Sequence, residues 1–220
     1  MAEQLDVQQT KEMLLATAKA MLHRGLVEGT SGNLSARLPD GNVLLTPSSL
    51  AYETMTLDDL VVCDADGNVV DGSRGPTSEK ALHCTTLRLH TDIGAVIHSH
   101  AKFATMFASV RQPIPAVIEE FVVYVGGDVP VAEYRETGSD ALADEVAKHV
   151  GDRSAVLMAN HGLLTVGANP HHAMKIAALV ERTAEIVWGA RQLGKIHELP
   201  SELNEKFASI YTGFMRTNPM

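Results

Sequence analysis

The stretch "AVIHSHAKFATM", residues 95 to 106, places His98 and His100 directly after a short apolar run. The run includes β-branched residues and predicts a buried strand, in which alternate side chains point to the same face. The two imidazoles should therefore converge on one spot. Neutral histidine is a common metal ligand, and catalytic zinc sites usually have three protein ligands. The pattern thus predicts a metal centre if the chain supplies a third ligand.

A second apolar stretch, "AVLMANHGLLTVG" at residues 155 to 167, supplies that candidate in His161. It predicts two strands around His161, and Gly162 allows the backbone to approach another group closely. A single histidine near an apolar run is more often a hydrogen-bonded core residue than a ligand. An HxH pair and another histidine at strand ends favour a metal centre instead. The remaining histidines are expected to be surface or packing residues: His23, His83, His90, His149, His171, His172 and His197.

Composition limits the class of protein. With 220 residues and 45% hydrophobic content, the chain can bury a full core in one domain, residues 1 to 220. It has no apolar run of about 18 residues and no signal-peptide pattern, so we expect a cytoplasmic protein. A net charge of −9 without a basic cluster opposes binding to nucleic acid or to an anionic membrane. Cys63 and Cys84 form no ligand or disulfide motif and are expected to be buried, inert thiols.

The order of patterns indicates an α/β fold of the α+β type. A single domain with a central, mostly antiparallel β-sheet flanked by helices fits it, with a C-terminal helical segment at about 195–220. Asp-Gly and Asn turns between the early strands predict hairpins. The expected elements are a helix at 7–25, strands within 33–39, 42–47 and 59–70, a helix at 77–90, a strand at 93–100, a helix at 102–110, two strands within 155–167 and a helix at 170–193.

Three loops are rich in hydroxyl side chains: "GTSGNLS" at 29–35, "TPSSL" at 46–50 and "GPTSEK" at 75–80. Their backbone N–H groups and neutral hydroxyls would suit a phosphate if the loops converge. Taken one at a time, such clusters are more often ordinary turns. Glu79 ends the third loop, where a carboxylate stabilises the first turn of a helix. Beside a metal it would also suit general acid-base chemistry, and both roles are compatible.

Five motifs, "GTSGNLS", "TPSSL", "PTSE", "HSH" and "NHG", occur in this order at separations that resemble the class II aldolase/adducin family. Within that family the chain is most similar to the zinc-dependent fuculose-phosphate aldolases, over residues 8 to 195. The resemblance implies that His98, His100 and His161 bind Zn²⁺, which Mn²⁺ or Co²⁺ could replace. It makes Glu79 the acid-base residue and the fourth ligand of the resting site. It also implies phosphate binding by Gly32, Asn33, Ser48, Ser49, Thr77 and Ser78.

The implied reaction is cleavage of a ketose 1-phosphate such as L-fuculose 1-phosphate to dihydroxyacetone phosphate and a short aldehyde such as L-lactaldehyde. A homotetramer with sites at subunit interfaces is implied as well. A sugar-phosphate 4-epimerase, a metal-dependent decarboxylase of a 3-oxo-acid phosphate or an aromatic acid, and a non-catalytic adducin-like module are the alternatives. Lys80 and Lys102 are expected to face solvent, so no Schiff-base lysine is indicated.

The sequence departs from the family's pattern at two places. Thr77 stands where a serine is usual, although both supply a hydroxyl. In "IPAVIEEF" a tyrosine of the fuculose-phosphate aldolases is missing and Glu119 and Glu120 lie in that neighbourhood, so the pocket for the aldehyde is expected to differ. Tyr211 is a candidate for the family's C-terminal tyrosine that closes over the substrate.

Overall fold

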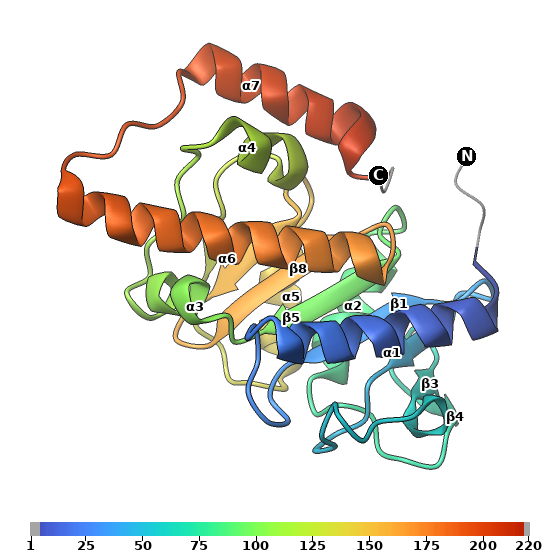
Figure 1. Cartoon of the computed structure of the whole chain (residues 1–220). Helices are drawn as coiled ribbons and strands as arrows, with labels where there is room; N and C mark the ends of the chain where they lie inside the picture. Colours follow the sequence, from blue (N-terminus) through green and yellow to red (C-terminus); the bar gives the residue numbers. More distant parts are fainter. Residues whose placement is uncertain (1–4, 218–220) are drawn as a thin grey trace.

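The structure, a computed structural model, describes residues 5 to 217, so the ends of the expected domain, residues 1–4 and 218–220, lie outside it. An eight-stranded sheet lies between two layers of helices (Figure 1). Its strand order is β4-β3-β2-β1-β5-β8-β7-β6, and every pair is antiparallel except β6 and β7. This confirms the predicted mostly antiparallel sheet. The strands are β1 (Asn33–Arg37), β2 (Val43–Leu45), β3 (Val61–Cys63), β4 (Val69–Asp71), β5 (Ala95–Ser99), β6 (Val131–Ala132), β7 (Ala155–Met158) and β8 (Gly162–Gly167).

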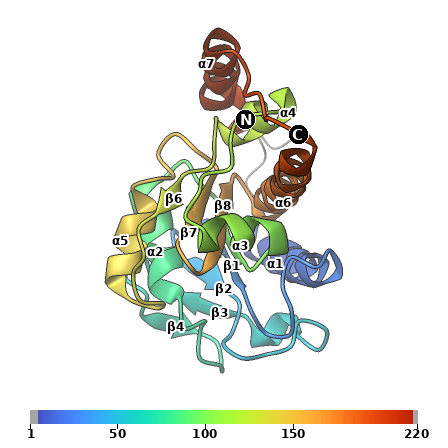
Figure 2. The same ribbon diagram turned by 90° about the vertical axis from the view of Figure 1, so that its left-hand side faces the viewer.

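The helices form three groups around the sheet (Figure 2). One face carries α1, α3 and α6, the opposite face carries α2 and α5, and α4 packs with α7 at one end of the molecule. A 3₁₀ turn at Leu57–Asp59 and a π-helical turn at Tyr211–Met215 complete the described elements. The helices are α1 (Val7–His23), α2 (Lys80–Leu89), α3 (Lys102–Ser109), α4 (Glu119–Val125), α5 (Asp140–Ala147), α6 (Pro170–Leu193) and α7 (Ser201–Ile210).

Local capping explains where the long helices begin. Asp6 and Gln9 form a reciprocal capping box at the start of α1. Asn169 caps α6, and Pro170 occupies the first turn, where the missing N–H has no partner to lose. The helix expected at 77–90 begins later, at Lys80, because the backbone N–H of Thr77 bonds to Thr46 O and keeps the preceding loop extended.

Strands β2, β3, β5, β7 and β8 are buried along their whole length, which is why their sequences are nearly continuous apolar runs, whereas the edge strand β4 is exposed. In β5, Ala95 and Ile97 belong to the core that also contains residues of α1, α3 and α6. Val96 belongs to the other core, together with Leu82 and Leu87 of α2. By the same alternation His98 faces the α2 side of the sheet.

Cys63 and Cys84 are free and buried, as expected. Lys80 and Lys102 are exposed, as expected. Across residues 5 to 217 no helix has the length and apolar character that crossing a bilayer requires.

Candidate metal and acid-base site

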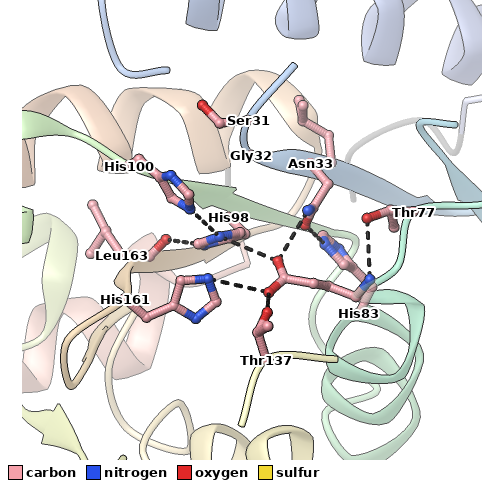
Figure 3. A network of polar contacts seen from close by, with 12 residues as sticks. Ser31, Gly32, Asn33, Thr77, His83, His98, His100, Thr137, His161 and Leu163 are labelled. Atoms are coloured by element: carbon pink, nitrogen blue, oxygen red, sulfur yellow. Dashed lines mark hydrogen bonds and ion pairs between the residues drawn. The ribbon is translucent and has the colours of Figure 1, made fainter. Parts of the chain in front are cut away.

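His98, His100 and His161 converge on one point (Figure 3). One ligand atom from each lies within 4.8 Å of the others, and the Nε2 atoms of His98 and His100 are 3.0 Å apart. His98 lies in β5, His100 follows it, and His161 lies in the turn between β7 and β8. Because β5 pairs directly with β8, the third histidine reaches the first two from the neighbouring strand.

The turn that carries His161 is held in a special backbone conformation. Asn160 has φ +57°, a left-handed conformation that asparagine tolerates better than most residues. Its side-chain oxygen accepts hydrogen bonds from the Arg111 guanidinium at 2.9 and 3.1 Å. These contacts fix the turn and therefore the direction from which His161 approaches the site.

The tautomer of His98 shows that the cluster fits a cation. Its Nδ1 lies 3.1 Å from the carbonyl oxygen of Leu163, which can only accept, so Nδ1 carries the proton and Nε2 carries a lone pair. That lone pair faces His100 Nε2 at 3.0 Å and Glu79 Oε2 at 3.2 Å. Glu79 Oε1 lies 3.3 Å from His161 Nε2. A proton can satisfy one such pair, whereas the convergence of all these electron-rich atoms matches the donor set of a divalent metal.

The charge states also suit metal binding. Burial raises the pKa of Glu79, but its charge interaction with His98 and hydrogen bonds from Thr137 and Asn33 outweigh that effect and lower the pKa to about 2. Burial lowers the pKa of His98 to about 3 and also lowers that of His100. At neutral pH the carboxylate is therefore ionised and these imidazoles are neutral, which is the protonation state that metal ligands require.

A pocket of about 210 Å³ opens beside the histidines and Glu79. The structure brings all three hydroxyl-rich loops to it, since Ser48 N bonds to Gly75 O and joins the second loop to the third. Gly32 is required where the first loop meets β5, because φ is +74° and a Cβ would lie 2.8 Å from His98 O. The candidate phosphate residues all line this pocket: Gly32, Asn33, Ser48, Ser49, Thr77 and Ser78.

Two further side chains contact this site, and neither was predicted from the sequence to be a site residue. Thr137, in the loop after β6, donates a 2.6 Å hydrogen bond to Glu79 Oε1. His83, expected among surface or packing residues, is fully buried, and its Nε2 lies 2.5 Å from the side-chain oxygen of Asn33. The four-residue spacing from Glu79 to His83 on the helix expected at 77–90 was a usable signal for His83. No comparable pattern pointed to Thr137.

Three other candidates do not reach the pocket of their own chain. Glu119 and Glu120 are exposed at the start of α4, where Glu120 lies 3.9 Å from an Arg182 nitrogen. Tyr211 is fully buried, and its hydroxyl lies 2.6 Å from Ser154 Oγ. Ser154 precedes β7, at the end of that strand opposite to His161.

Comparison with known proteins agrees with this geometry. The family model described as Class II Aldolase and Adducin N-terminal domain matches residues 12–188. A 5-deoxy-D-ribulose 1-phosphate aldolase of Bacillus thuringiensis serovar kurstaki is 34% identical over 209 residues, which are 94% of this chain and 98% of that protein. An L-fuculose phosphate aldolase of Escherichia coli O6:H1 is 34% identical over 173 residues, 79% of this chain and 80% of that protein.

A solved structure of an L-fuculose 1-phosphate aldolase superposes with a TM-score of 0.89 at 35% identity and covers 96% of this chain and 100% of that chain. The resemblance first indicated by the five motifs is thereby confirmed. The chain belongs to the class II aldolase and adducin family, as one of its aldolases.

Proposed function

We propose that this aldolase cleaves the C3–C4 bond of a ketose 1-phosphate and releases dihydroxyacetone phosphate and a short aldehyde. One observation carries the proposal: the Glu79 carboxylate contacts His98 and His161 at the floor of a pocket lined by three hydroxyl-rich loops. Zn²⁺ is the proposed metal, with Mn²⁺ or Co²⁺ as substitutes, because borderline imidazole and carboxylate ligands accept all three. His98, His100 and His161 would hold it, with Glu79 as the fourth ligand.

Each part of the site has a separate task in this reaction. The bound ion supplies Lewis-acid stabilisation of the negative charge that develops on the ketose oxygens as the bond breaks. Glu79 is ionised, is anchored by Asn33 and Thr137, and exchanges the proton on C3 of the dihydroxyacetone phosphate part. Neutral hydroxyls and backbone N–H groups of the three loops bind the phosphate. The hydroxyls of Ser48, Ser49 and Ser78 are exposed and suited to it.

The proposed substrate is a deoxyketose 1-phosphate whose last carbon is a methyl group. The substrates named for the two relatives described above share this end: L-fuculose 1-phosphate would give L-lactaldehyde, and 5-deoxyribulose 1-phosphate would give acetaldehyde. The Bacillus relative matches a larger share of this chain than the Escherichia relative, 94% against 79%, and this favours the five-carbon sugar as a second candidate.

A homotetramer with sites at subunit interfaces remains part of the proposal. It would bring the exposed Glu119 and Glu120 to the aldehyde side of a neighbouring chain's pocket, which they do not reach in their own chain. Tyr211, which is fully buried, would act there through the C-terminal turn that it anchors. The cytosol remains the expected compartment.

The first experiment measures release of dihydroxyacetone phosphate from both sugars by zinc-loaded protein, chelated protein and the Glu79→Ala variant. We expect release that stops on chelation, returns with Zn²⁺ and is lost in Glu79→Ala. Lys80→Ala is the matched control, because Lys80 neighbours Glu79 but is exposed and donates to Gly67 O. Its activity should equal that of the wild type.

The same assay separates the alternatives. An epimerase would interconvert sugar phosphates without releasing free aldehyde, and a decarboxylase would release CO₂ from an acid substrate. If zinc-loaded protein releases no dihydroxyacetone phosphate from either sugar, the proposed substrate class is wrong.

A further inference from the structure

His83 follows Glu79 by four residues and lies about one helical turn further along α2. Residues four apart on a helix stack on the same side, so the His83 ring projects from α2 toward the sheet in line with Glu79. Its two nitrogens meet β1: Nδ1 lies 2.7 Å from Ser35 Oγ, and Nε2 lies 2.5 Å from Asn33 Oδ1. Asn33 and Ser35 are two residues apart in β1 and therefore point to the same face.

The direction of every hydrogen bond in this series follows from the carboxylate at its end. Glu79 is ionised and can only accept, so the atom of Asn33 that lies 3.1 Å from Oε2 is the amide nitrogen. The amide oxygen of Asn33 then faces His83, whose Nε2 must carry the proton. Its Nδ1 therefore accepts the hydrogen bond from the Ser35 hydroxyl. The series runs from Ser35 through His83 and Asn33 to Glu79, and all four residues are buried.

We infer that His83 is a positioning residue for the Glu79 carboxylate, which it orients by holding the Asn33 amide with its NH₂ group toward Oε2. The inference deepens the proposed function and rests on it, because Oε2 is also the oxygen that lies 3.2 Å from His98 Nε2. A change in the direction of Oε2 would therefore alter both the acid-base group and the donor set of the metal site.

The orientation of the Asn33 amide needs to be fixed because the side-chain amide has a second possible orientation. Rotated by half a turn, the amide would place its oxygen against the ionised carboxylate, and a buried contact between two acceptors is unfavourable. Within the described part of the chain, Asn33 Oδ1 has His83 Nε2 as its hydrogen-bond donor. Asn33 itself is held in place by β1, where it is the register partner of His98. The strand fixes the backbone of Asn33, and His83 thus fixes the rotation of its side-chain amide.

An ordinary core role for His83 makes different predictions. A histidine that only fills space would affect stability when replaced, but it would leave metal affinity and turnover of the folded protein unchanged. His172 offers a matched comparison, because it too is buried and lies on α6 outside the pocket lining.

The experiment compares His83→Phe, His83→Gln and Ser35→Ala with His172→Phe and the wild type. For each folded protein, Co²⁺ affinity is measured by competition with a chromophoric chelator, and the Co²⁺ absorption spectrum, kcat and KM are recorded. We expect His83→Phe to lose about 10- to 100-fold in Co²⁺ affinity and in kcat, as is usual when a partner of a metal ligand is removed, with KM changed little.

His83→Gln should recover most of this loss, because the glutamine NH₂ group can donate to Asn33 Oδ1 in the place of Nε2–H. Ser35→Ala should show a smaller loss of the same kind. His172→Phe should keep the wild-type Co²⁺ affinity and spectrum. If His83→Phe binds Co²⁺ as the wild type does and keeps its kcat, or if His172→Phe loses as much, the inference is wrong.

Should His83→Phe fail to fold, Ser35→Ala and His83→Gln test the inference in its place. The inference is wrong if Ser35→Ala keeps the wild-type kcat and His83→Gln loses kcat and Co²⁺ affinity. Should the wild type release no dihydroxyacetone phosphate while His83→Phe still weakens Co²⁺ binding, the proposed function fails and the positioning role of His83 stands.

Discussion

The hydroxyl of Thr137 and the carboxylate of Glu79 lie 2.6 Å apart, although two strands and three helices separate them in the sequence. Thr137 donates to Oε1 while Asn33 donates to Oε2, so the carboxylate is held from both sides. Neither donor carries a charge. The position of this proposed acid-base group therefore depends on two hydrogen bonds from uncharged donors, one on β1 and one in the loop after the edge strand β6.

Replacing Thr137 by valine tests one of these two bonds. The change keeps the shape of the side chain and removes the donor, and a hydrogen bond to a charged group is worth about 1.5–3 kcal/mol, so kcat should fall about 10- to 100-fold. Steady-state kinetics measure the effect. Thr137→Ser keeps the hydroxyl and should retain most of the activity, and equal rates for the valine variant and the wild type would contradict the assigned role.

Gly162 should tolerate no side chain, because an added Cβ would lie 2.5 Å from Ser99 O and 3.2 Å from ring atoms of both His98 and His100. Gly162→Ala is therefore expected to displace the histidine pair and weaken metal binding about tenfold or more, the scale seen when the support of metal ligands is disturbed. Equilibrium titration with Zn²⁺ or Co²⁺ measures this.

Gly189→Ala is the control for that substitution. Gly189 lies in α6 with no atom within 4 Å of an added Cβ, and alanine is the better helix former by about 0.5–1 kcal/mol. This variant should gain slight stability and bind metal normally. Normal metal binding by Gly162→Ala would contradict the close approach of Gly162 in β8 to Ser99 O in β5.

His172 should make the folded state sensitive to mild acid. Burial, with a smaller effect of the Lys175 charge, lowers the pKa of His172 to about 4. Between pH 6.5 and about 4 the unfolded chain binds a proton that the folded chain does not, so this residue lowers stability progressively as the pH falls through that window. Between pH 7 and pH 5 its share is about 2 kcal/mol, at 1.36 kcal/mol per pH unit below 6.5.

Urea unfolding of the wild type and of His172→Phe at pH 7 and pH 5 measures this share. The variant should lose about 2 kcal/mol less than the wild type between the two values, since the other buried histidines contribute equally to both proteins. Parallel losses in the two proteins would assign the acid sensitivity to other groups.

Glu181 should stabilise the helix that follows the HxH pair. Its two carboxylate oxygens accept hydrogen bonds from the backbone N–H groups of Phe103 and Ala104, each at 2.9 Å, in the first turn of α3. Removing a side chain that caps a helix costs about 0.5–2 kcal/mol, so Glu181→Ala should lower the free energy of unfolding by about that amount. Denaturant titration checks it against Glu185→Ala, an exposed residue of the same helix that should change little.

The convergence of His98, His100 and His161 could be predicted from the sequence because its signal is local. Alternation along β5 puts His98 on one face, and the second strand-end histidine needed only strand pairing to join it. The signal of the three hydroxyl-rich loops was equally local, since hydroxyls, glycines and prolines are typical of turns wherever they occur. Helix α6 was expected at 170–193 and is found at Pro170–Leu193, because Asn169 and Pro170 mark its start.

The other parts depend on contacts between distant segments. Thr137 contacts Glu79 only because β6 joins the sheet beside β7, and a two-residue strand leaves almost no pattern in the sequence. Tyr211 is placed by its bond to Ser154 and by Arg216, whose Nη1 lies 3.0 Å from the tyrosine hydroxyl. Resemblance suggested a substrate contact for Tyr211, whereas the described contacts are those of a buried residue that anchors the C-terminal turn.

The position of the three histidines has a mechanical consequence. His100 directly follows β5 and His161 directly precedes β8, so α3, α4 and α5 all lie in the stretch of chain between them. An ion shared by these side chains would act as a reversible cross-link and close that stretch into a loop, as a disulfide would. Closing a long loop removes much conformational freedom from the unfolded chain, so the metal-loaded protein should unfold more slowly than the metal-free protein. Release of the ion and loss of the fold should then occur together.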